Sequence, residues 1–192
     1  MNFKLFVSCC LVAGFILCGC SPKVKRVDPG TQTDLSGRWN ETDSRMTSSA
    51  MIEQMFAHRW VVDFERRYQK KPVIIVGLVT NRSHEHINTE TFIADIERAI
   101  INDGSIRLVE AGRRRDELRG ERAGQQDFAS PETVKRWGNE LGADFMLQGT
   151  INSIVDSNRR QQSIYYQIDL RLTNIETNET VWMGNKSHKK LI

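Results

Sequence analysis

No cysteine follows residue 20 in this sequence. All four cysteines, at positions 9, 10, 18 and 20, lie within the first 20 of the 192 residues. A disulfide framework, a cysteine-ligated zinc site and a catalytic thiol are therefore excluded from the rest of the chain. The sequence also lacks the G-x-S-x-G, P-loop and G-x-G-x-x-G motifs, and no pattern assembles a nucleophile, a base and an oxyanion donor. We therefore expect a protein that is not an enzyme and uses no cofactor, metal or small-molecule substrate.

A strong excess of charge of one sign is absent as well. The 27 basic and 24 acidic residues give a net charge of +3, which is too small to indicate a nucleic-acid partner without a basic stripe. Hydrophobic residues make up 39% of the chain, enough to bury one modest core. The length predicts one domain with room for an appendage.

The first 19 residues have the order of a lipoprotein signal peptide. Lys4 supplies a positive start, and the apolar stretch over 5–19 is shorter than the roughly 20 residues of a membrane-spanning helix. It ends in Leu17-Cys18-Gly19-Cys20, which resembles the bacterial lipobox. We expect cleavage before Cys20 and lipidation of its thiol. An ordinary secretory signal and a short membrane anchor are the alternatives.

Lipid on Cys20 would anchor the mature protein permanently. Ser21, at the position that follows the lipidated cysteine, favours the outer membrane, with the protein facing the periplasm. Residues 20–42 are polar and contain a D-P-G turn, so they predict a tether, and residues 43–192 predict one globular domain. Trp39 is an apolar ring in this polar segment, and we expect it to dock on its own domain or on a partner.

Hydrophobic periodicity predicts a mixed α/β domain with an antiparallel meander at its end. Phe92, Ile96 and Ile100 recur at helical spacing, whereas the run from Ile164 to Leu172 alternates apolar and polar residues. A strand, a helix and a strand in close succession imply a parallel crossover, with the helices mainly on one face of the sheet. The expected helices cover 44–69, 89–102, 113–125 and 131–141, and the expected strands cover 72–80, 106–109, 145–154, 164–172 and 180–185.

Two polar clusters are candidate sites. The loop His84-Glu85-His86 places two histidines on one side of an extended segment, as in a metalloenzyme, but a metal site needs three or four converging ligands. The other interpretation is a solvated loop that bonds the next helix. The arginine-rich stretch around 113–122 is either an exposed, internally paired helix or a recognition surface, because arginine is enriched at binding hot spots.

Several segments, in their order along the chain, resemble the LpoB-type outer-membrane lipoproteins that activate penicillin-binding proteins. They are D-L-S-G-R-W-N at 34–40, V-G-L-V-T followed by Asn81-Arg82-Ser83, I-N-D-G before I-R-L-V, L-G-A-D at 141–144 and E-T-N-E-T-V-W at 176–182. The resemblance covers most of 36–188. It implies a fold similar to the amino-terminal module of TolB.

What the resemblance implies is a binding protein that docks on a bifunctional class A penicillin-binding protein and activates it allosterically. The tether is much shorter than in the enteric members of the family. A structural or assembly lipoprotein of an envelope secretion or Tol-like complex is the alternative. The residues predicted to contact the partner are Trp39, Asn81, Arg82, Arg113, Arg114, Arg115 and Arg119.

Overall fold

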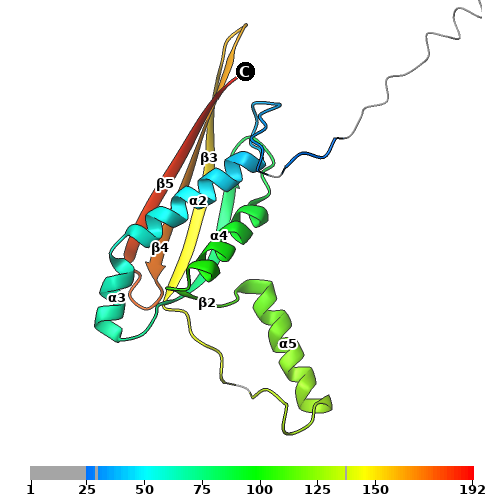
Figure 1. Cartoon of the computed structure of the whole chain (residues 1–192), viewed down its shortest axis with the longest axis vertical. Helices are drawn as coiled ribbons and strands as arrows, with labels where there is room; N and C mark the ends of the chain where they lie inside the picture. The colour runs from blue at the N-terminus through cyan, green and yellow to red at the C-terminus, as the bar shows by residue number, and fades with distance from the viewer. Residues whose placement is uncertain (1–24, 29, 137) are drawn as a thin grey trace, which may run out of the picture. The chain divides into compact units, whose positions relative to one another are not determined.

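The computed structural model describes residues 25–28, 30–136 and 138–192 (Figure 1). The chain divides into two units, and the folded domain is the second, Thr33–Ile192. In the first unit, the described residues are exposed and include a turn in which the Thr31 N–H donates to the Asp28 carbonyl (2.9 Å). Cys20 and the predicted signal peptide lie outside the described residues.

Five strands form one mixed sheet in the order β2-β1-β3-β4-β5. β1 (Val73–Arg82) pairs in parallel with β2 (Arg107–Leu108) on one side and with β3 (Phe145–Ser157) on the other. β3, β4 (Gln162–Asn174) and β5 (Thr180–Leu191) form an antiparallel meander. The predicted fold class, a mixed α/β domain ending in a meander, is confirmed.

The helices differ from prediction at the beginning of the domain. The single helix expected over 44–69 is two helices, α2 (Glu41–Ala57) and α3 (Trp60–Tyr68). The backbone becomes extended at His58, and the buried indole of Trp60 donates a 3.0 Å hydrogen bond to the carbonyl of Met55. This bond satisfies a carbonyl that the end of α2 leaves without a helical partner.

Prediction and structure agree closely on α4 (Thr89–Asp103), which connects the parallel strands β1 and β2 in the chain. Asn88 caps its first turn, and Gly104 ends it with a positive φ of 74°, a conformation that glycine adopts without steric cost. α5 (Gly112–Phe128) covers the predicted arginine-rich helix and extends it at both ends. The crossover expected from the sequence is therefore present.

The helix expected over 131–141 was wrong. The described part of this segment has turns at 131–133 and at Gly138, and no helix or strand up to the start of β3. An amphipathic helix gains most of its stability from packing its apolar face, and Leu141 remains 41% exposed here. Trp137, within the segment where this helix was expected, lies outside the described residues.

The core lies between the sheet and the helices α2 and α4, which cross one of its faces (Figure 1). The alternating residues of β4 point into it, and Tyr166, Ile168, Leu170 and Leu172 are each at most 1% exposed. Each side chain of this size contributes about 1.5–3 kcal/mol through burial. The opposite face carries exposed side chains such as Leu78, Arg171 and Met183, which line a shallow groove of about 310 Å³.

Candidate functional site

Residues 33–40, here called the strap, lie against the domain. Trp39 packs edge-on against Tyr166 and His188, with ring centroids 5.5 and 5.8 Å apart. Its indole N–H donates a 2.9 Å hydrogen bond to Ser44 Oγ near the start of α2. Trp39 therefore docks on its own domain, which explains an apolar ring in a polar segment.

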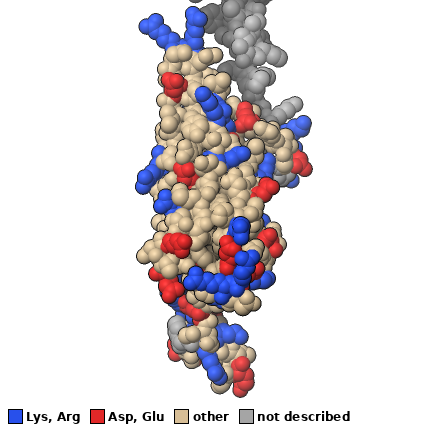
Figure 2. Space-filling model, turned by 90° about the vertical axis from the view of Figure 1, so that its left-hand side faces the viewer, with Lys and Arg blue, Asp and Glu red and all other residues tan. Residues whose placement is uncertain are grey.

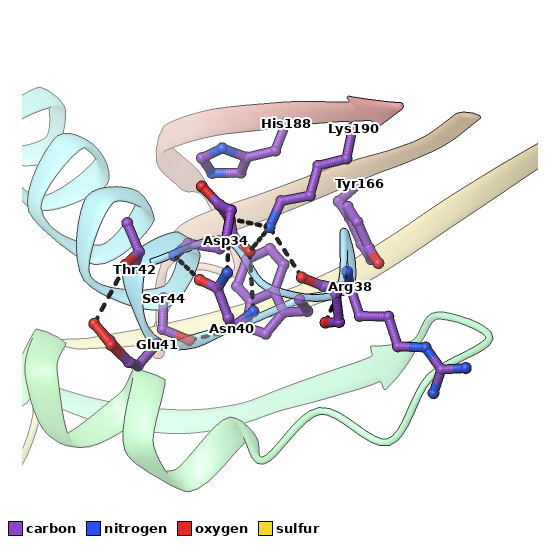
Figure 3. A network of polar contacts seen from close by, with 12 residues as sticks. Asp34, Arg38, Asn40, Glu41, Thr42, Ser44, Tyr166, His188 and Lys190 are labelled. Atoms are coloured by element: carbon purple, nitrogen blue, oxygen red, sulfur yellow. Dashed lines mark hydrogen bonds and ion pairs between the residues drawn. The ribbon is translucent and has the colours of Figure 1, made fainter. Parts of the chain in front are cut away.

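Lys190, near the end of β5, fastens the strap (Figure 3). Its ammonium lies 2.9 Å from Asp34 Oδ1 and 2.6 Å from Asp43 Oδ2, and donates to the carbonyl of Arg38 at 2.9 Å. Burial lowers the pKa of Lys190, but the hydrogen bonds to Asp43 and Asp34 outweigh burial and raise it overall. One cation thus joins the strap, α2 and β5.

Asn40 connects the same carboxylates to the start of α2. Its side-chain amide donates to Asp34 Oδ1 at 2.7 Å, and its side-chain oxygen accepts from the backbone N–H of Asp43 at 3.1 Å. Asp43 returns the bond by accepting from the backbone N–H of Asn40 at 2.9 Å. This reciprocal capping box fixes where α2 begins, so the strap and the helix are ordered together.

Glu85, in the loop that follows β1, bonds this loop to β4 and to the strap. Its carboxylate accepts the Tyr166 hydroxyl at 2.7 Å and the backbone N–H of Trp39 at 3.1 Å. Burial, and then the hydrogen bond to Glu85, raises the pKa of Tyr166. Asn81 donates from its amide to the carbonyl of Glu85 at 2.7 Å, so its side chain points into the loop.

The two loop histidines do not converge. The ring Nδ1 of His84 lies 2.7 Å from Ser153 Oγ on β3, and its backbone N–H donates to the same oxygen at 3.0 Å, whereas His86 is exposed. Among residues 25–28, 30–136 and 138–192, no group of three or more His, Cys, Asp or Glu side chains is placed to hold a metal ion. The hydrogen bonds of His84 therefore hold the loop against β3.

His188 lies beneath Trp39 on β5. Its Nε2 and Thr47 Oγ1 are hydrogen-bonded at 2.7 Å. Burial lowers the pKa of His188 and outweighs the opposing effect of the nearby Asp43. The neutral imidazole is therefore the form that this packing favours.

α5 has no buried residue in its 17 positions. Arg119 forms two hydrogen bonds with the Glu140 carboxylate, at 2.9 and 3.0 Å, and Arg122 forms one at 2.8 Å. The bonds from Arg119 and Arg122 lower the pKa of Glu140 to about 2. Arg114 bonds Glu97 of α4. Ion pairs, rather than apolar packing, connect this helix to the domain.

The predicted partner contacts thus fall into two groups. Trp39 and Asn81 meet at Glu85, with the exposed Arg82 next to them in sequence. The arginines lie on α5, where Arg113 is 91% exposed and its side chain is 3.4 Å from Glu117. Arg115 donates to the carbonyl of Glu110 at 2.7 Å.

Sequence reasoning missed the ion-pair centre at Lys190, although it lies where the strap, α2 and β5 meet. The two side chains that Lys190 joins are 156 and 147 positions away along the chain. The one local signal was Asn40 followed by Asp43, a pair that fits a capping box.

The sequence model of a family described as the peptidoglycan-synthase activator LpoB matches residues 43–188. The chain belongs to this family. The match covers more than half of the chain and includes β1 to β4, most of β5 and the helices α3, α4 and α5. The predicted resemblance to the LpoB family is therefore confirmed, and the family's role is that of a regulator of peptidoglycan synthesis.

The similarity to solved structures of LpoB carboxy-terminal domains is weaker than the match to the family's sequence model. The domain from Escherichia coli is 18% identical, with a TM-score of 0.47, and the comparison covers 76% of this chain and 98% of that one. The Salmonella enterica domain is 17% identical, with a TM-score of 0.46 and the same coverage. Lipoprotein GNA1162 from Neisseria meningitidis is 15% identical, with a TM-score of 0.38, covering 62% of this chain and 83% of that one. The family assignment rests on the sequence match alone.

The comparison with curated proteins finds no match. Within the part of the chain that the structure describes, no helix is both long and apolar enough to cross a membrane.

Proposed function

We propose that this protein is an outer-membrane lipoprotein whose folded domain binds a class A penicillin-binding protein and activates its synthesis of peptidoglycan. The observation that carries the proposal is the LpoB family match over 43–188, which spans nearly the whole folded domain. Cys20 is the proposed lipid attachment point, with residues 1–19 removed as the signal peptide and residues 20–42 joining the lipid to the domain. The partner is a protein, and the mechanism needs no catalytic group on this chain.

Activation by binding alone requires that the regulator prefer the active form of the synthase. A ligand shifts a conformational equilibrium only by its difference in affinity for the two states. A tenfold preference for the active conformation corresponds to about 1.4 kcal/mol, within the usual range of coupling between sites. The domain therefore acts as an allosteric effector.

The proposed contact surface includes the arginines of α5, especially Arg113 and Arg115. An amphipathic helix normally buries an apolar stripe, but α5 buries no residue. Its sequence is therefore not explained by core packing, and its exposed guanidinium groups suit recognition of carboxylates. Arg82 is an additional exposed candidate at the end of β1.

The short connection limits where the partner can be reached. With the strap docked, residues 21–32 span at most about 40 Å when fully extended. We therefore propose that the synthase projects its regulatory region outward toward the anchored domain, or that the distance between the two membranes is small where they meet.

A reconstituted assay tests the proposal. Full-length protein in detergent is added to the purified class A enzymes of the source organism, and glycan polymerisation is followed. We expect binding and a faster rate, with both reduced in Arg113→Glu and retained in Arg159→Glu, an exposed arginine of the β3–β4 turn. No binding and no change in rate with any class A enzyme would contradict the proposal.

The anchor is tested separately. Mass spectrometry of protein extracted from fractionated envelopes should find the mature chain starting at Cys20 and bearing acyl chains, in the outer-membrane fraction. Cys20→Ala should abolish both lipidation and membrane association. Unmodified Cys20 in the mature protein would contradict this part.

A further inference from the structure

β5 forms one edge of the sheet, and its outward backbone groups can be assigned. Gln162 and Ile192 exchange two backbone hydrogen bonds, of 2.9 and 2.8 Å. In an antiparallel ladder such doubly bonded pairs alternate with unbonded pairs. The register from Ser163–Leu191 to Leu172–Trp182 is continuous, so the even-numbered residues of β5 bond to β4. The odd-numbered residues point their N–H and C=O groups away from the sheet.

We call these outward groups the β5 edge. They belong to Met183, Asn185, Ser187, Lys189 and Leu191, whose side chains are all exposed. Within the described residues, no backbone or side-chain partner bonds them. β5 is the leftmost strand in Figure 1, so Figure 2 looks toward this edge.

The two edges of the sheet differ in how they are protected. β2 has only two residues, and a short strand offers little to an approaching chain. β5 has 12 residues and no proline, so it presents a long row of donors and acceptors. Such a row is the usual docking site for an extended peptide that adds to a sheet.

Charge selects what can add to this edge. The sequence from Thr180 to Ile192 has three lysines and no acidic residue. Lys190 is committed to Asp34 and Asp43, but Lys186 and Lys189 form no ion pair within the described part of the chain. Lys186 and Lys189 differ by an odd number of positions, so they lie on opposite faces of the sheet and flank the edge on both sides.

A second copy of this chain is a poor occupant. An antiparallel pairing of two β5 strands over 186–190 sets lysines opposite or beside lysines, and like charges at such positions are destabilising. The chain's own segment 21–32 is disfavoured for the same reason, because it carries Lys23, Lys25 and Arg26 against a single Asp28.

We propose that the β5 edge binds an extended, carboxylate-bearing segment of a partner protein, which adds to the sheet as a further strand. Backbone hydrogen bonds to the odd-numbered residues supply the alignment. Carboxylates on one face of the added strand meet Lys186, and carboxylates on its other face meet Lys189. This inference rests on the edge itself and goes beyond the activation of a synthase.

The test uses a capped peptide of about ten residues, within the usual range of strand lengths, in which two threonines alternate with two glutamates, so that both faces of the added strand carry carboxylates. It is titrated into the detergent-purified mature protein, and backbone amides are followed by NMR. We expect the amides of Asn185, Ser187 and Lys189 to shift and to gain protection from hydrogen exchange. The same peptide with lysine in place of glutamate should bind at least tenfold more weakly.

Three variants separate the backbone and charge contributions. Ser187→Pro removes one outward N–H, which an edge strand tolerates, and should weaken binding about fivefold, the effect of roughly one hydrogen bond. Ser187→Ala keeps the N–H and should bind as the unchanged protein does. Lys186→Glu combined with Lys189→Glu should lower affinity about tenfold or more and remains informative if the proline variant does not fold.

Equal binding of the two peptides, no protection of the odd-numbered amides, or β5-mediated dimers of the chain would each overturn the inference. Synthase activation is measured on the same variants. Activation without peptide binding would overturn the edge inference and leave the proposed function intact. Peptide binding without any activation of class A enzymes would contradict the proposed function alone.

Discussion

The hydroxyl of Tyr166 donates a 2.7 Å hydrogen bond to Oε1 of Glu85, a residue 81 positions earlier in the chain. Through this bond a strand of the core supports the loop that follows β1. The other carboxylate oxygen of Glu85 accepts the backbone N–H of Trp39. One largely buried carboxylate therefore connects the sheet, the loop and the strap.

Replacing Tyr166 with Phe tests this connection. The change removes the nearest donor to Oε1 of Glu85, whose side chain is only 11% exposed, and leaves His84 Nε2 at 3.3 Å. A hydrogen bond to a charged group contributes about 1.5–3 kcal/mol. We expect urea denaturation to show a loss of about 2 kcal/mol. Tyr165→Phe is the matched control, because the Tyr165 hydroxyl has no hydrogen bond within the described residues, and its effect should stay below about 0.5 kcal/mol. Equal effects of the two changes would contradict this role.

Replacing Lys190 with Met should release the strap. The Lys190 side chain is 13% exposed and the Asp43 side chain is 7% exposed, so the change leaves a nearly buried carboxylate without its cation, at a cost of about 3 kcal/mol. Limited proteolysis should then cut within 33–38 faster than in the control Lys189→Met. Unchanged cleavage of the strap would show that Lys190 does not hold it.

The same lysine predicts a loss of stability at high pH. Its pKa is raised above the ordinary 10.5, so its contribution is complete below 10.5 and disappears as the pH rises through the folded-state value. Lys190→Met should remove this part of the alkaline transition in pH-dependent denaturation. Retention of the full transition would contradict the assignment.

Glu140 should stay ionised in strongly acidic solution. The pKa falls from 4.5 to about 2 through the hydrogen bonds from Arg119 and Arg122. Its stabilising contribution is thus present above 4.5 and lost as the pH falls through about 2. A carboxyl NMR titration should give a midpoint near 2 in the unchanged protein and near 4 in Arg119→Gln combined with Arg122→Gln. An ordinary midpoint in the unchanged protein would mean that Glu140 does not hold α5.

His188 should make the domain less stable in mild acid. Burial lowers its pKa below the ordinary 6.5, so the unfolded chain binds a proton more readily than the folded one does. Stability is therefore complete above 6.5 and declines as the pH falls below it. His188→Gln should flatten this decline in denaturation between about pH 7 and pH 5, whereas His86→Gln, at an exposed position, should not.

The elements that the sequence predicted best are those with strong local signals. α4 combines helical spacing with the cap Asn88 and the terminating Gly104, and each is visible within a few residues of its effect. β4 alternates buried and less buried side chains along its length, as its pattern indicated. The two failures, at His58 and over 131–141, lie where packing rather than local preference decides the backbone.

The sequence alone determined the strand and helix order in most of the domain, the absence of thiol chemistry after residue 20, and the resemblance that the family match confirms. Only the tertiary structure decided what Trp39, Glu85 and Lys190 do, because their partners are distant in the chain and a hydrogen bond leaves no periodic signature. It also decided that β5, and not β2, offers a long free edge. Local patterns reflect one segment's own preference, whereas an ion pair or a sheet edge depends on which segments the fold places side by side.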